Sequence, residues 1–131
     1  MILLQEVINM IKGIGIDIIE VDRIRRAVAK NSSFVDRIFT LNEKKVFEDN
    51  NYPAQTIAGF FAAKEAVSKA LGTGIRNMKW KDIEILKDPL GKPYVELHNN
   101  AKDLACTMNI DEILISISHS KENAVAQAIA I

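Results

Sequence analysis

The sequence contains a single cysteine, Cys106, and this excludes two classes of small protein. One cysteine cannot build a disulfide framework or a cysteine-rich zinc site. We therefore expect Cys106 to behave as a small apolar residue on a helix. A chain without disulfides suits a reducing compartment, so a cytoplasmic location is expected.

The sequence also lacks an excess of either charge and any long apolar run. Its 17 lysine and arginine residues balance 17 aspartate and glutamate residues, whereas proteins that bind nucleic acid without sequence preference carry a basic excess. We therefore expect no nucleic-acid partner. No apolar run reaches the roughly 18 residues that indicate a transmembrane helix, so no membrane partner is expected either.

The first nine residues, MILLQEVIN, lack the features of a secretory signal, because they have neither a basic start nor a small-residue cleavage site. We interpret residues 1–9 as an N-terminal extension without a catalytic role; a short helix that packs locally is the alternative. Repeats, low-complexity tracts and Gly/Ser-rich linkers are absent as well. Residues 1–131 are therefore predicted to form a single domain.

What the sequence does contain is enough apolar residues for a core, at 48% of the chain. In the first half, the β-branched run at 12–19 predicts a buried strand, and the apolar spacing at 21–30 predicts a helix. The TLNE capping box predicts a second helix from 40 to about 49. A third helix is predicted from Pro53 to the glycines at 72 and 74.

Strands dominate the second half of the chain. Residues 82–87 and 92–98 flank DPLG, whose proline and glycine suit a type I turn, so they predict a hairpin. A short helix at 99–108 precedes a second hairpin made by 112–120 and 123–131. The fold class predicted is α+β, with an antiparallel β-sheet of about five strands packed against a long helix and shorter helices.

The segment FFAAKEAVSKALGTG, residues 60–74, carries an unusual set of polar residues for such an apolar helix. On a helical wheel Glu65, Ser68 and Lys69 form one stripe opposite the apolar side. A solvated face with an ordinary glutamate–lysine pair, worth a few tenths of a kcal/mol, would also explain this stripe.

Asp17 gives the polar stripe a second interpretation. It lies within the apolar strand, on the same face as Gly13 and Gly15, and a buried acid is costly without a partner. Two carboxylates from different elements, with a lysine nearby, suit a hard cation and a phosphate group. Backbone N–H groups at 72–77 could add an anion nest.

The first predicted helix has a basic stripe made of Arg23, Arg26 and Lys30. Taken from the residues alone, this stripe is interpreted as a solvated helix face.

Four segments in this order resemble the holo-acyl-carrier-protein synthases, the small 4′-phosphopantetheinyl transferases. The segments are GIGIDIIEVDRI, FAAKEAVSKALGTGI, DIEILKDPLGKPYV and ISISHSKENAVAQAI, and the resemblance covers Met10 to Ile131. It implies the fold of that family and transfer of 4′-phosphopantetheine from coenzyme A to a serine of apo acyl carrier protein, with adenosine 3′,5′-bisphosphate released. It further implies Mg²⁺ as cofactor, a homotrimer with sites at subunit interfaces, and a role in fatty acid biosynthesis.

The resemblance also implies roles for individual residues. Asp17 and Glu65 match the metal-binding acids, and with Lys69, beside the pyrophosphate, they form the predicted catalytic set. Positions matching the coenzyme A site are Lys64, Ser68, Gly72, Gly74, Lys87, Gly91, Lys92, Pro93 and His119, and positions matching the carrier contact are Arg23, Arg26, Phe34 and Arg37. Taken without the resemblance, His119 would be interpreted as a core histidine.

Two features depart from the family pattern. Phe60 stands where members usually have an arginine just before FAAKE, and the preceding segment NNYPAQT lacks the basic residues often seen there. Both differences remove positive charge from the expected 3′-phosphate end of coenzyme A. Lys44 and Lys45 are expected to compensate if their helix folds over the cleft.

Two other functions would use the same residues. A metal-dependent phosphohydrolase acting on coenzyme A-like pyrophosphates would need the acids and the lysine but not the basic helix. A non-enzymatic α+β binding module would keep the acids for structural reasons alone.

Overall fold

The computed structural model describes residues 10–31 and 33–131, so the interpretation of residues 1–9 lies outside the described part. The predicted helices and strands are present within a residue or two of their expected bounds, with two short additions, α3 and η1. In chain order the elements are β1 (Gly13–Glu20), α2 (Val21–Lys30), α3 (Ser33–Ile38), α4 (Leu41–Asp49), α5 (Ala54–Ala70), η1 (Trp80–Asp82), β2 (Ile83–Lys87), β3 (Pro93–Leu97), α6 (Asn99–Thr107), β4 (Ile113–His119) and β5 (Asn123–Ala130).

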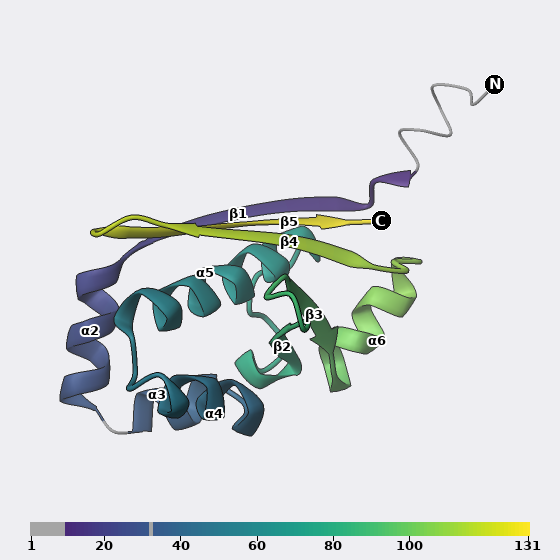
Figure 1. Ribbon diagram of the computed structural model, residues 1–131. Coiled ribbons are helices and arrows are strands. Elements are labelled where there is room, and N and C mark those ends of the chain that lie inside the picture. The colour runs from purple at the N-terminus through teal and green to yellow at the C-terminus, as the bar shows by residue number, and fades with distance from the viewer. Residues whose placement is uncertain (1–9, 32) are drawn as a thin grey trace.

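The α+β class is confirmed, but the strands form two antiparallel sheets rather than one. The larger sheet has the order β1-β5-β4, and β2 pairs with β3 in a separate hairpin. The long helix α5 lies along one face of the larger sheet, with α3 and α4 on the far side of the helix and α2 beside one end of it (Figure 1). In the register of the sheet, Asp17 faces Ala126 of β5, which in turn faces Ile117 of β4.

Two glycines of β1 allow α5 to lie directly against the strand. A Cβ atom added to Gly15 would lie 1.9 Å from the backbone oxygen of Ala66, and one added to Gly13 would lie 2.0 Å from that of Ala70. Because no side chain separates the two backbones, the next residue on this face of β1, Asp17, lies beside α5.

Local signals account for the ends of several elements. The capping box of α4 is confirmed, since the Thr40 hydroxyl accepts from the Glu43 N–H and the Glu43 carboxylate accepts from the Thr40 N–H. Pro53 is the N-cap of α5 rather than part of its first turn. In the hairpin turn the N–H of Gly91 donates to the oxygen of Asp88, and Gly91 has a φ of +87°, which favours glycine.

The core lies between α5, the inner face of the larger sheet and the smaller helices. Helix α5 is buried on nearly every side, and an aromatic group of Phe39, Phe47 and Phe60 packs edge to face beside it. Among the described helices, none has the length and apolar character needed to cross a membrane.

The outer face of the larger sheet is apolar and uncovered. Ile14, Ile16 and Ile18 of β1 are each more than 60% exposed, and Leu114 of β4 lies on the same face. No described helix or strand covers this face (Figure 1). An exposed apolar strand of this kind is typical of an interaction surface.

Candidate functional site

Asp17, Glu65 and Lys69 converge at the contact between β1 and α5. The ammonium group of Lys69 lies 3.3 Å from Oδ1 of Asp17 and donates to the backbone oxygen of Ile16 at 2.8 Å. The Asp17 side chain is 18% exposed and that of Lys69 is 49% exposed. The group is therefore open to solvent on one side and backed by the sheet on the other.

Electrostatics shows that Glu65 belongs to the same group. Partial burial raises the pKa of the Glu65 carboxyl above its ordinary value, the nearby charge of Asp17 raises it further, and Lys69 partly offsets both effects. A carboxylate whose proton affinity is raised by a neighbouring carboxylate is suited to share a cation with it. Mg²⁺ is typically held by one or two carboxylates, with substrate phosphate oxygens and water completing its shell, so the donor set fits this ion.

The raised pKa of Glu65 predicts how stability depends on pH. A carboxyl whose pKa is higher in the folded state than in the unfolded state lowers the free energy of unfolding when it is ionised. The full cost applies above the folded-state pKa, and it disappears below the unfolded-state pKa. In EDTA, Glu65→Gln should therefore stabilise the protein at neutral pH, with a gain that vanishes in acid. Urea denaturation at both pH values measures this. Equal effects at the two pH values would contradict it, and the exposed Glu112→Gln serves as the control.

A second part of the predicted site surrounds a cavity beside the N-terminal half of α5. The cavity has a volume of about 180 Å³, and four residues predicted for coenzyme A line it: Lys87, Gly91, Pro93 and His119. His119 is exposed at the end of β4, so it is not a core histidine. Lys92 lies in the same turn but outside the lining. Phe60, Gln55 and Thr56, which depart from the family pattern, also line the cavity, and no sequence pattern indicated the remaining lining residues, Gly59 and Ile117.

The positive groups near this cavity are not those expected to compensate for Phe60. The ammonium of Lys87 lies 5.8 Å from the centre of the Phe60 ring, and Phe60 itself is 2% exposed. Lys44 forms an ion pair with Asp36 at 3.1 Å. Neither Lys44 nor Lys45 lines the cavity, so Lys87 and His119 provide the basic groups there.

Two residues expected in the coenzyme A cleft are buried. Lys64 and Ser68 have no exposed surface. The ammonium of Lys64 pairs with Glu43, and the hydroxyl of Ser68 donates to the backbone oxygen of Glu65 at 2.7 Å. In this arrangement neither side chain can contact a ligand. Both residues therefore have a structural role in place of the predicted contact with coenzyme A.

The N–H groups of the glycines that follow α5 pair with backbone oxygens in the last turn of the helix. The N–H of Gly72 donates to the oxygen of Lys69, and that of Gly74 donates to the oxygen of Ser68. Their φ angles of +84° and +61° are in the left-handed region, as expected for a helix C-terminus. Because these two N–H groups are occupied, they do not contribute to the expected anion nest.

The acids and the cavity lie at opposite edges of the larger sheet. Asp17 is on β1 and His119 is on β4, with β5 between these strands. Helix α5 follows this division, because Gly59 lies against Ile117 of β4 whereas Lys69 contacts β1. Within one chain the two parts therefore lie on different edge strands and along different halves of α5.

The predicted carrier surface is only partly a free basic face. Arg26 forms an ion pair with Asp22 at 3.2 Å, whereas no ion pair links Arg23 or Arg37 to another described residue. All three arginines are exposed. Phe34 is half-buried, with its ring stacked on that of Phe61 at a centroid distance of 6.4 Å. It therefore borders this surface rather than projecting from it.

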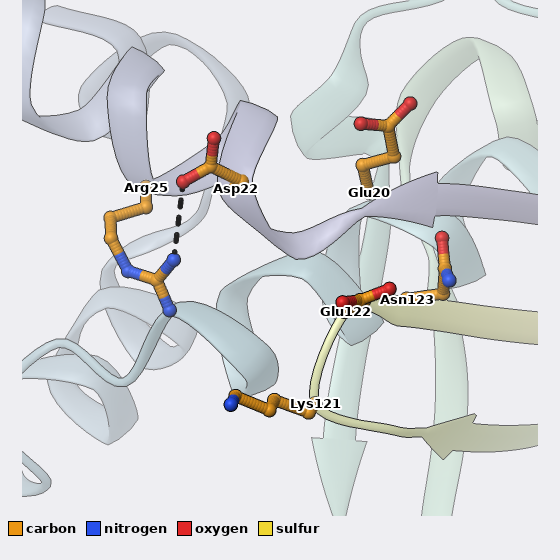
Figure 2. Close-up of a pocket in the computed structure, with 6 residues that line it drawn as sticks. All are labelled: Glu20, Asp22, Arg25, Lys121, Glu122 and Asn123. Atoms are coloured by element: carbon orange, nitrogen blue, oxygen red, sulfur yellow. Dashed lines mark hydrogen bonds and ion pairs between the residues drawn. The ribbon is translucent and has the colours of Figure 1, made fainter.

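A surface hollow lies where β1 meets α2, and its lining includes no residue of either part of the site. Its volume is about 460 Å³, and it is open and of mixed charge. Figure 2 shows Arg25 turned toward Asp22, with 3.3 Å between the guanidinium and the carboxylate, while the remaining charged groups do not converge. The residues that line it are Glu20, Asp22, Arg25, Lys121, Glu122 and Asn123. The hollow has no group of ligands aimed at one point, and we assign it no chemistry.

A group of three possible metal ligands occurs elsewhere, on the β2–β3 hairpin. The ligand atoms of Glu84, Glu96 and His98 lie within 4.8 Å of one another, the only such group of three among the residues that the structure describes. The Glu84 carboxylate already accepts from Thr40 at 2.6 Å and lies 3.1 Å from His98. His98 is therefore part of a hydrogen-bonded network that joins the hairpin to the start of α4.

Comparison with known proteins identifies close relatives. The model of the 4′-phosphopantetheinyl transferase superfamily matches residues 13–128. A holo-[acyl-carrier-protein] synthase of Alkaliphilus oremlandii is 76% identical over 122 residues, which cover 93% of this chain and 100% of the relative. The corresponding synthase of Clostridium tetani is 52% identical over 120 residues, covering 92% of this chain and 95% of its own length.

Solved structures show the same fold. A holo-(acyl-carrier-protein) synthase of Bacillus anthracis, in complex with coenzyme A (3′,5′-ADP), matches with a TM-score of 0.77 and 42% identity, over 92% of this chain and 96% of that one. The Helicobacter pylori synthase in complex with coenzyme A has a TM-score of 0.80 and 36% identity, over 90% and 99%. The segments that carried the resemblance thus lie within a match that spans nearly all described residues.

Proposed function

The chain belongs to the 4′-phosphopantetheinyl transferase superfamily and is an enzyme of the holo-[acyl-carrier-protein] synthase type, and on that basis we propose which of its residues carry the reaction. The proposed substrates are coenzyme A and an apo acyl carrier protein, and the proposed cofactor is Mg²⁺. The convergence of Asp17, Glu65 and Lys69 is the observation that carries this proposal. Fatty acid biosynthesis is the proposed pathway.

In the proposed reaction, a serine oxygen of the carrier attacks the pyrophosphate phosphorus that bears the pantetheine arm. A new P–O bond forms to serine, and the bond to the bridging oxygen breaks, releasing adenosine 3′,5′-bisphosphate. Mg²⁺ held by Asp17 and Glu65 would supply Lewis-acid stabilisation of the pyrophosphate charge. Lys69 neutralises charge on the transferred group, as positioned lysines do in phosphoryl transfer.

Glu65 is our candidate for the group that accepts the serine proton. Its carboxyl is part of the charged group at the site, and a positioned carboxylate can take up a proton directly or through a bound water. The acceptor and metal-binding roles are compatible because a carboxylate has two oxygens.

The cavity around Lys87 and His119 is proposed to bind the nucleotide end of coenzyme A. Because the acids and this cavity lie on opposite edge strands of the larger sheet, we propose that one active site combines the acids of one protomer with the cavity of another. The uncovered isoleucine face of β1 supports assembly as a homotrimer, because association would bury it.

A shared site predicts that two defective variants will complement each other. Asp17→Asn and His119→Ala should each be poorly active alone. After the two are unfolded together and refolded, random mixing should leave about a quarter of the shared sites with both halves intact, and activity should return to about that fraction of wild type. Mass measurement of the assembly gives the number of protomers. A mixture no more active than its components would contradict a shared site.

The carrier protein is proposed to bind the basic face formed by Arg23, Arg26 and Arg37, with Phe34 at its border. Acyl carrier proteins are small and acidic, so opposite charge would steer and orient them. The exposure of all three arginines and the lack of an ion pair at Arg23 and Arg37 among the described residues support this surface.

Intact-mass measurement of the carrier tests the whole proposal. The protein is mixed with coenzyme A, Mg²⁺ and an apo acyl carrier protein. We expect the carrier to gain the mass of one phosphopantetheine arm and the gain to be lost in EDTA. Cleavage of coenzyme A without any mass gain would favour the phosphohydrolase, and an unchanged coenzyme A with several carriers would favour the binding module.

A further inference from the structure

The buried pair of Lys64 and Glu43 joins four elements at one point. Neither side chain has exposed surface, and the ammonium lies 2.8 Å from the carboxylate. Lys64, on α5, also donates to the backbone oxygen of Trp80 in η1 and to that of Ile83, the first residue of β2. Glu43, on α4, accepts from the N–H of Ile85 in β2 at 2.8 Å.

A buried ion pair is a poor device for stability alone. Burial raises the pKa of Glu43 and lowers that of Lys64, which reflects the cost of removing both charges from water. Apolar pairs of similar volume are often as stable or more so. The pair instead constrains how the elements are oriented relative to one another, because a hydrogen bond has a preferred angle and an apolar contact does not.

The orientation of α5 matters because its proposed catalytic residues follow Lys64 in the chain. Glu65 is the next residue, and Lys69 is five positions further on than Lys64. Holding the Lys64 ammonium against α4 and β2 fixes the rotation of α5 about its own axis. That rotation determines whether Glu65 and Lys69 point toward Asp17 on β1.

We propose that Lys64 and Glu43 are positioning residues that set the rotation of α5 and thereby aim Glu65 and Lys69 at the reacting groups. This inference rests on the proposed function of that site. A displacement of about 1 Å in a catalytic group can cost about 10²-fold in rate. Loss of the pair should therefore reduce turnover far more than it reduces stability.

The test is the double variant Glu43→Gln/Lys64→Met, which removes both charges while nearly conserving volume. Trp80, the one tryptophan of the chain, lies next to the Lys64–Glu43 pair, which we call the anchor. Its fluorescence reports folding. We expect a folded protein with kcat lowered about 10²-fold. Calorimetry should show Mg²⁺ binding to the free protein weakened about tenfold, and carrier binding should change less than about twofold because α2 lies outside the anchor.

Val67→Ala is the matched control, because Val67 is a buried apolar residue of the same helix that takes no part in the anchor. It should lower the melting temperature yet keep kcat within about threefold of wild type. Wild-type turnover in the double variant would overturn the proposal. So would a loss in Val67→Ala equal to that of the double variant.

A second variant keeps the test decisive if the double variant does not fold. Glu43→Gln alone removes the charge partner but leaves an amide oxygen that can accept from Lys64. We expect it to keep more turnover than any variant without Lys64, and full activity in Lys64→Met would overturn the proposal. Failure of the wild-type protein to modify any carrier would instead count against the proposed function, because these comparisons need an active parent.

Discussion

Asp17→Asn is expected to lower turnover by at least about 10³-fold while leaving the fold intact. An amide is a much weaker ligand for a hard cation, and loss of several kcal/mol of charge stabilisation corresponds to this factor at about 1.4 kcal/mol per tenfold. Stability should not fall, because the substitution removes the Asp17 charge that raises the pKa of Glu65. The measurement is kcat from the rate of carrier mass gain, with melting temperature recorded in parallel.

The control for this variant is Asp103→Asn, the same chemical change on the exposed surface of α6. It should leave turnover within about twofold, as surface substitutions usually do. A turnover in Asp17→Asn above a tenth of wild type, with unchanged Mg²⁺ dependence, would exclude Asp17 as a metal ligand.

Gly15→Ala is expected to have the largest effect on stability. Its new Cβ would lie 1.9 Å from the backbone oxygen of Ala66 and 2.9 Å from the backbone nitrogen of Ala70, and backbone atoms of a buried helix cannot move aside cheaply. Overpacking of this kind costs about 3 kcal/mol or more. Urea denaturation measures the loss, which should appear as a lower midpoint with an unchanged slope.

Gly74→Ala separates steric overlap from backbone strain. Gly74 has a φ of +61°, but a Cβ added there would meet no atom within 4 Å, so only the cost of the left-handed backbone, about 1 kcal/mol, applies. If Gly15→Ala were no more destabilising than Gly74→Ala, the close contact between β1 and α5 would not exist in solution.

The convergence of the acids was predictable because it follows from local patterns. Two glycines at alternate positions of a strand mark one face as the approach side of another backbone, and Asp17 lies on that face. Glu65 and Lys69 are one helical turn apart, so a single contact between strand and helix brings all three together.

The burial of Lys64 and Ser68 was not predictable from the helical wheel. A wheel separates an apolar from a polar side, but α5 is enclosed on nearly every side by elements from the whole chain. The partner of Lys64 is Glu43, which the sequence identifies only as the glutamate of a capping box. No local pattern indicates that the Glu43 carboxylate both caps α4 and pairs with Lys64.

The division of the strands into two sheets, and the cavity beside α5, depend on long-range packing. Hairpin signals predict which strands pair with a sequence neighbour, as β2 does with β3 and β4 with β5. They carry no information about whether two hairpins join. The lining residues Gln55, Thr56 and Ile117 are ordinary polar and apolar residues that gain their role from position alone.

The pairing of β1 with β5 has a consequence for how the protein matures. Gly13 pairs with Ala130, so the strand that carries Asp17 is held in the sheet by the described strand that leaves the ribosome last. Contacts of such long sequence separation form late and slowly. In a nascent chain β1 therefore stays unpaired until β5 emerges, and the catalytic centre forms only after that. Chaperone contact during translation should concentrate on this first strand.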